Sequence, residues 1–210
     1  MLKIRCSSLH LLMTKAKSGN GLSESAKSMI KKAVIQQQYG RVKELETPQI
    51  MKGRTLEDEA IKAIGLTKAR TLKKHTGRLS NDWITGECDF ISASCIEDVK
   101  CSWSIDTFPF FQEDAEKECR KAGYDWQGQG YMWLYDRPIH YVHYVLLPTP
   151  SELLKAWDNH EMHIDMVESI PLQKRIRTVV IERDESLHGE IVEKAALAQQ
   201  YAKSLILELS

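Results

Sequence analysis

Three residues of this sequence could act together chemically: Asp89, Asp98 and Lys100. The segment Cys95–Cys101 has strand composition, and residues two apart in a strand share a face, so Asp98 and Lys100 would project together. The spacer 92–94 indicates a tight hairpin, which would return this strand beside Asp89. Two carboxylates and an ammonium group would then converge. Phosphodiester hydrolysis with Mg²⁺ needs such a set to hold the cation, activate water and stabilise charge on phosphate.

An Asp-x-Lys pattern is common, and alone it more often marks an exposed pair of strand side chains. Here the charged residues lie among apolar ones, with Phe90 and Ile91 after the first aspartate and Ile96 and Val99 around the second. Charged groups near a core are costly unless they are paired or bound to a metal. This context favours a metal site over a solvated strand surface.

Two helical segments flank the pattern. Glu57 lies on a helix expected over about 49–64, from which it could reach a metal. Gln127 and Tyr131 are four residues apart in a second expected helix and would share one of its faces. Such a pair could orient the lysine, a water molecule or a phosphate.

Four short motifs of the sequence resemble, in chain order, those of the PD-(D/E)XK nuclease superfamily. They are G-x3-E-x2-A at 53–60, G-x2-D at 86–89, D-x-K at 98–100 and Q-x3-Y at 127–131. The resemblance is to the branch with RecB-like nucleases and the YqaJ or lambda-type phage exonucleases. It covers about residues 5–133, with a weaker similarity at 179–185. Each motif is weak singly, but four in order are a fairly specific signal.

The resemblance implies a role for each matched position. Asp89 and Asp98 would be metal ligands, the carbonyl of Val99 would complete the metal shell, and Lys100 would be the catalytic lysine. Glu57 matches the upstream glutamate, although Glu59 is a competing candidate.

Further candidate positions belong to the trailing motif and to the expected DNA contacts. Gln127 and Tyr131 match the Gln/Tyr motif, with Gln129 as an alternative. The expected DNA contacts are Arg5 and Ser7 at a terminal phosphate, together with Arg54, Lys73 and Lys74. The last two belong to a basic loop, for which phosphate contact is the better interpretation in a nuclease.

The resemblance also bears on cofactors. It implies Mg²⁺, with Mn²⁺ as a substitute. Some RecB-like nucleases bind an iron–sulfur cluster through one early and three late cysteines, but no cysteine follows Cys119, so no cluster is expected. Cys88 stands where the family name suggests proline, a position that is often variable.

The implied function is a metal-dependent exonuclease that acts on double-stranded DNA ends, 5′ to 3′, in phage-type recombination. A single-strand annealing protein and a homotrimer are the implied partners. The alternatives are a structure-specific endonuclease of the same superfamily, a non-catalytic DNA-binding protein that retains the fold, and an unrelated α/β protein. The intact trio of Asp89, Asp98 and Lys100 argues against a pure binding module.

The bulk composition fits this interpretation. Residues 1–78 contain 17 Lys/Arg and 6 Asp/Glu, a net charge of +11, whereas the remainder carries −11. A basic third beside an acidic remainder is compatible with a phosphate-contacting face plus a metal site, although it could be accidental. Five cysteines without a CxxC pair favour free thiols in the host cytoplasm. No apolar run is long enough to suggest a membrane span, and the N-terminal residues show no signal-peptide pattern.

The elements that would position these residues form a mixed α/β pattern. Helices are expected over 21–48, 49–64 (with Gly65 as C-cap), 112–135, 151–169 and 185–208, and strands over 83–91, 95–101, 139–147 and 177–183. This order indicates a restriction-endonuclease-like core with a central mixed β-sheet flanked by helices. We expect one nuclease domain over 1–210, with a basic, mainly helical part at 1–80, a catalytic sheet at 81–183 and a final helix.

Overall fold

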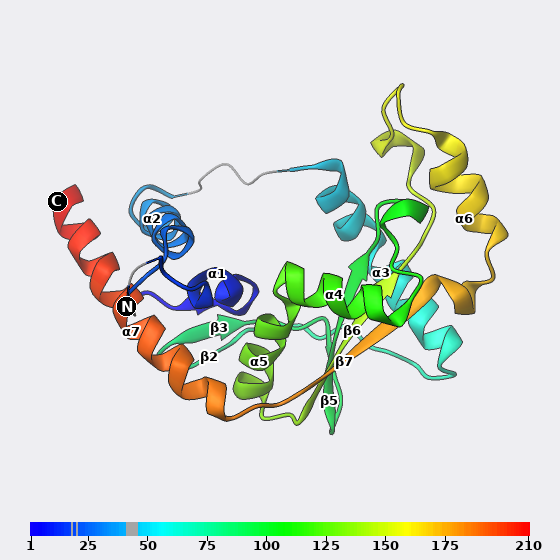
Figure 1. Cartoon of the computed structure of the whole chain (residues 1–210). Coiled ribbons are helices and arrows are strands. Elements are labelled where there is room, and N and C mark those ends of the chain that lie inside the picture. Colours follow the sequence, from blue (N-terminus) through cyan, green and yellow to red (C-terminus); the bar gives the residue numbers. More distant parts are fainter. Residues whose placement is uncertain (18, 20, 41–45) are drawn as a thin grey trace.

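The protein is described here from a computed structural model, which covers residues 1–17, 19, 21–40 and 46–210 (Figure 1). Its strands are β1 (Ile4–Arg5), β2 (Leu79–Ser80), β3 (Ile84–Gly86), β4 (Phe90–Ile91), β5 (Cys95–Cys101), β6 (Ile139–Val145) and β7 (Ile176–Glu182). Its α-helices are α1 (Leu9–Met13), α2 (Glu24–Tyr39), α3 (Pro48–Thr67), α4 (Gln112–Ala122), α5 (Tyr124–Tyr135), α6 (Met166–Ser169) and α7 (Ser186–Leu209). The predicted mixed α/β class is confirmed.

The strands form two mixed sheets. One has the order β4-β5-β6-β7, with β5 and β6 parallel and the outer pairs antiparallel. The other has the order β1-β3-β2. The single strand expected over 83–91 is therefore wrong: β3 belongs to one sheet and β4 to the other, with residues 87–89 between them. This change of sheet places Asp89 at the start of the hairpin.

Helices cover both faces of the four-stranded sheet (Figure 1). On one face α3 packs against β5, and Ile64 of the helix joins Val99 and Val145 in an apolar cluster. On the other face α4 packs against β7 and α5 against β6, and Val142 and Val179 belong to a second cluster. A third cluster joins α1, α2, α5 and α7. The two sides of β5 are thus supported by different helices.

Local chemistry explains the start of α2 and the packing near the end of α3. The Ser23 side chain accepts a hydrogen bond from the backbone N–H of Ala26 and caps α2. The helix α3 continues past Gly65, the predicted C-cap, to Thr67. The carbonyl oxygen of Arg70 approaches Gly65 so closely that an added Cβ would lie 2.7 Å from it. Gly65 therefore permits close backbone packing rather than ending the helix.

Two other expected helices are altered. The helix over 112–135 divides at Gly123, which has φ +75° and lies against His10, so that α4 and α5 form two separate helices. The helix over 151–169 is wrong for most of its length: the chain forms 3-10 turn Ser151–Leu153, π-helix Glu161–Asp165 and the short α6. Two prolines, at 148 and 150, restrict the entry to this segment. No helix in the described part of the chain is long and apolar enough to cross a membrane.

Candidate active site

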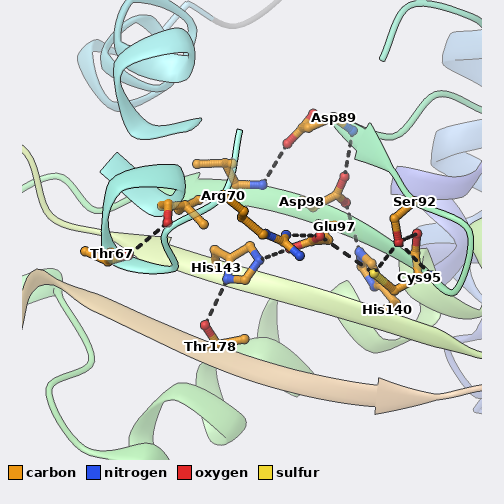
Figure 2. Close-up of polar contacts among 12 residues, drawn as sticks. Thr67, Arg70, Asp89, Ser92, Cys95, Glu97, Asp98, His140, His143 and Thr178 are labelled. Carbon is orange, nitrogen blue, oxygen red and sulfur yellow. Dashed lines mark hydrogen bonds and ion pairs between the residues drawn. The ribbon is translucent and has the colours of Figure 1, made fainter. Parts of the chain in front are cut away.

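The two predicted aspartates face each other across the β4–β5 hairpin. Phe90 pairs with Glu97 in the antiparallel register, so Asp89 lies opposite Asp98. The backbone N–H of Asp89 donates to Oδ1 of Asp98 at 3.2 Å, and the backbone N–H of Val99 donates to Oδ2 of Asp89 at 2.7 Å (Figure 2). Each carboxylate is therefore fixed by a backbone group of the opposite segment, which fits a site that needs rigid ligands.

Lys100 lies on the same face of β5 as Asp98, as the strand period predicted. Its Nζ is 3.8 Å from Oδ2 of Asp98. The same ammonium group lies 4.6 Å from the ring centre of Tyr124, at the start of α5. Burial opposes the charged form, but the charges of Asp98 and Asp89 outweigh it and raise the pKa of Lys100. The lysine is thus a cation at neutral pH.

The carboxylate pair is electrostatically unequal. Burial and the charge of Asp98 raise the pKa of Asp89 to about 7. Asp98 is more deeply buried, yet Lys100 and His140 lower its pKa to about 2. One lysine therefore does not balance two adjacent carboxylates, and a further positive charge would stabilise the ionised pair.

The donor atoms fit a hard divalent cation. Oδ2 of Asp98 is buried and accepts no hydrogen bond from any residue that the structure describes. Because the N–H and C=O of a strand residue point to the same side, the bond from Val99 N–H to Asp89 places the Val99 carbonyl on that side as well. Within the described chain, no group of three or more His, Cys, Asp or Glu side chains could hold a metal. Two carboxylates, one carbonyl and water suit Mg²⁺, which keeps several waters.

Glu57, the predicted upstream glutamate, lies on α3 and forms no metal-binding group with Asp89 and Asp98 among the described residues. Oε1 of Glu57 forms an ion pair with Nζ of Lys74 at 2.9 Å. The charge of Glu57 also contributes to the raised pKa of Asp89. Glu59, the competing candidate, is exposed and lines a surface cavity with Lys62. The geometry therefore supports Glu57 over Glu59 as the acidic residue near the site.

The three predicted residues of α5 separate into two groups. Gln127 and Tyr131 are buried, and the amide of Gln127 donates to the phenol oxygen of Tyr131 at 2.9 Å. Gln129 is also buried, but its amide binds the backbone of Glu182 at 2.8 Å and of Asp184 at 2.9 Å. The structure therefore does not bring Gln129 to the carboxylates; it connects α5 to the end of β7.

Sequence reasoning missed two residues beside the site. His140 is fully buried on β6, with Nε2 3.4 Å from Oδ2 of Asp98, and within the described part of the chain neither ring nitrogen has a hydrogen-bond partner. A Cβ on Gly128 would lie 2.3 Å from its Nδ1, so α5 approaches this ring very closely. Tyr124, beneath Lys100, lies three residues before Gln127 on α5. That helical spacing from Gln127 and Tyr131 was a usable signal.

The predicted DNA contacts lie on the surface. Arg5 and Ser7 are exposed at the end of β1 and in the following 3-10 turn, which packs against α5. Arg54 lies 3.6 Å from Glu46 and Lys73 is exposed, whereas Lys74 forms the ion pair with Glu57. Four of these side chains qualify as phosphate contacts by their exposure alone, whereas Lys74 is also connected to the carboxylate pair through Glu57.

The chain is similar to exonucleases of known structure. The chain is 42% identical to a phage-related exonuclease from Haemophilus somnus 129PT, with a TM-score of 0.94 over 100% of this chain and 97% of that one. It also resembles the alkaline exonuclease LHK-Exo from Laribacter hongkongensis, at 16% identity and a TM-score of 0.66 over 99% and 91% of the two chains. A structure of LHK-Exo in complex with dAMP gives 17% identity and the same TM-score. No family model and no curated protein matches the sequence.

Proposed function

The chain belongs to the family of phage-related exonucleases, within the PD-(D/E)XK nucleases, and from that premise we propose that it is a metal-dependent deoxyribonuclease. The observation that carries the proposal is the arrangement of Asp89, Asp98 and Lys100. The two carboxylates are fixed by backbone N–H groups, and Oδ2 of Asp98, which accepts no hydrogen bond from the described residues, lies beside the lysine ammonium group.

Each residue then has a distinct role. Asp89, Asp98 and the Val99 carbonyl would hold Mg²⁺, or Mn²⁺ in its place, and Glu57, whose charge acts on Asp89, would hold a water molecule beside the ion. A cation bound there lowers the pKa of water and neutralises charge on the phosphate. Lys100 orients the attacking water or stabilises the developing negative charge. The Gln127–Tyr131 pair would support the Asp98 side of the site, because the Tyr131 ring packs against His140 with the ring centres 6.0 Å apart.

The proposed substrate is the end of double-stranded DNA, degraded 5′ to 3′. LHK-Exo, of similar fold, has been seen with dAMP, a product of DNA hydrolysis. Arg5 and Ser7 would contact the terminal phosphate, while Arg54, Lys73 and Lys74 would contact the backbone. Such contacts give affinity without sequence preference.

We further propose a role in phage-type recombination in the host cytoplasm. Resection of one strand would supply a 3′ overhang to a single-strand annealing protein. A homotrimer around the duplex would favour processive digestion. Sedimentation that gives a monomer at micromolar concentration would remove the trimer and leave the nuclease assignment intact.

Digestion of end-labelled linear duplex tests the function. The expected result is release of mononucleotides from the 5′ end with Mg²⁺ or Mn²⁺, none with EDTA, and none from a covalently closed circle. Lys100→Ala should abolish cleavage and retain DNA binding. Cleavage of the circle would indicate the endonuclease alternative, and DNA binding without cleavage by the wild type would indicate the non-catalytic one.

A further inference from the structure

Residues 70–78, which we call the basic strap, lead from the end of α3 to β2 without regular secondary structure. Figure 1 shows that these two elements lie on opposite sides of β5, so the strap crosses the catalytic region. It contains four basic residues and no acidic one. The backbone N–H of His75 donates to the carbonyl of Asp89 at 2.7 Å, and Lys74 pairs with Glu57 at 2.9 Å. The strap therefore lies directly against the candidate metal site.

A buried carboxylate on β5 anchors the beginning of the strap. Glu97 precedes Asp98, and since side chains alternate along a strand, it points to the opposite face of β5. Glu97 is 1% exposed and forms an ion pair with the guanidinium group of Arg70, the first strap residue (Figure 2). The residue beside a predicted metal ligand thus holds the segment that carries the basic side chains.

The same carboxylate is held from the far side by two further strands. Nε2 of His143 on β6 lies 2.8 Å from Oε2 of Glu97, and Nδ1 lies 2.8 Å from Oγ1 of Thr178 on β7 (Figure 2). Burial lowers the pKa of His143, so the ring is neutral, with its proton on Nε2 facing Glu97 and the Thr178 hydroxyl donating to Nδ1. The network therefore holds one negative charge, and Arg70 supplies its positive partner.

Backbone contacts fix the strap at two points: the N–H of Arg70 donates to the carbonyl of Gly65 at 3.0 Å, and the N–H of His75 donates to that of Asp89. Between these points Leu72 packs against the apolar cluster that contains Ile64 and Val99, and Lys74 forms its solvent-accessible ion pair with Glu57. Lys73 and Lys74 are exposed. Phosphate contacts gain affinity when the basic groups are already positioned, because less side-chain and loop ordering is needed on binding.

We propose that Glu97 and Arg70 are positioning residues, whose ion pair holds the basic strap so that Lys73 and Lys74 face the DNA backbone beside the metal site. The inference rests on the proposed function, because it presupposes DNA as the ligand. It assigns the pair no contact with reacting atoms. It explains why a carboxylate is buried next to Asp98 on the face of β5 that points away from Lys100.

The test uses the sign of a charge change. Glu97→Gln removes one negative charge, so electrostatics alone predicts equal or tighter DNA binding. Positioning predicts weaker binding, because the anchor is lost. For a labelled duplex in EDTA we expect Kd to rise about 60-fold at 0.1 M salt, and the plot of log association constant against log salt concentration to become about 2 less steep, as expected for roughly two lost phosphate contacts.

A matched control is Asp58→Asn, which removes one exposed charge that faces Lys74 from α3 and leaves the Glu97–Arg70 ion pair in place; it should leave Kd unchanged or slightly lower. Circular dichroism and thermal unfolding verify that each variant is folded. Should Glu97→Gln fail to fold, Arg70→Lys keeps the charge but loses the planar fork, and should raise Kd with the same fall in salt slope.

Non-additivity separates positioning from general destabilisation. In a Lys73→Gln, Lys74→Gln background, loss of the anchor should weaken DNA binding no further. The inference is overturned if a folded anchor variant binds DNA as tightly as the wild type, or if its effect adds fully to that of the two lysines. A wild type that binds no DNA would instead overturn the proposed function.

Discussion

Because the pKa of Asp89 is raised and that of Asp98 is lowered, replacement of each by asparagine should change the stability of the fold in opposite directions. Asp89 has a pKa of about 7 in the folded protein against its ordinary 3.8. This raised pKa means that the folded state is most stable below pH 3.8 and loses stability as pH rises towards 7. The difference of about 3 units corresponds to about 4 kcal/mol at pH 8 in the absence of metal. Asp89→Asn keeps an acceptor for the Val99 N–H and removes this cost.

We therefore expect the unfolding free energy of Asp89→Asn to exceed that of the wild type by up to about 4 kcal/mol at pH 8, and by about 1.6 kcal/mol at pH 5. Asp98→Asn should do the reverse. Its carboxylate has a lowered pKa, so its ionised form contributes stability above pH 3.8, and its loss leaves Lys100 buried without its nearest partner. Both variants should lose cleavage activity.

Urea unfolding in EDTA at pH 5 and pH 8 measures these differences. Addition of Mg²⁺ at pH 8 should stabilise the wild type and neither variant. If Asp89→Asn is no more stable than wild type at pH 8, or if its advantage is the same at pH 5, the conclusion that Asp89 and Asp98 repel each other in a buried site is wrong.

Three further substitutions probe the surroundings. Lys52 is fully buried, its ammonium group donates to three neutral oxygens, and burial lowers its pKa to about 8. Between pH 8 and 10.5 the unfolding free energy of the wild type should therefore rise by about 3 kcal/mol relative to that of Lys52→Met, as measured by urea unfolding. Gly128→Ala should displace His140, with a loss of about 1–3 kcal/mol in unfolding free energy and a fall in kcat. Tyr124→Leu should lower kcat roughly 3- to 30-fold by removing the ring beneath Lys100, whereas Tyr124→Phe retains activity.

The controls for these variants are specific. Gly189→Ala on α7, where an added Cβ meets nothing within 4 Å, should stabilise the protein by about 0.5–1 kcal/mol. Unchanged kcat in Gly128→Ala would refute a role for the buried histidine. Equal activity of the Leu and Phe variants at 124 would show that the aromatic ring does not position the lysine. A pH-independent difference for Lys52→Met would mean that this lysine ionises normally.

The sequence predicted the reactive trio because its geometry is local. Asp98 and Lys100 share a face by the period of a strand, and a short hairpin brings Asp89 to them. The helical spacing of Gln127 and Tyr131 is local in the same way, and the structure joins them by a hydrogen bond. Local periodicity was therefore sufficient for these positions.

The missed features depend on pairings between distant segments. His140 meets Asp98 only through the parallel register of β5 with β6, in which Ile96 pairs with His140. Glu97 meets Arg70 only because the chain turns back after α3. Neither register nor the path of an irregular segment follows from periodicity. The break at Gly123 was available as a glycine signal, but the steric reason for it, His10, lies far away in sequence.

The central claim is that the carboxylates of Asp89 and Asp98 share one divalent cation beside Lys100. Anomalous diffraction from crystals grown with Mn²⁺ measures this directly. We expect a single strong peak at about 2.1–2.2 Å from oxygens of both aspartates and from the Val99 carbonyl. A peak bound elsewhere, or no peak at saturating Mn²⁺ above pH 8, would contradict the assignment of this site as the nuclease centre.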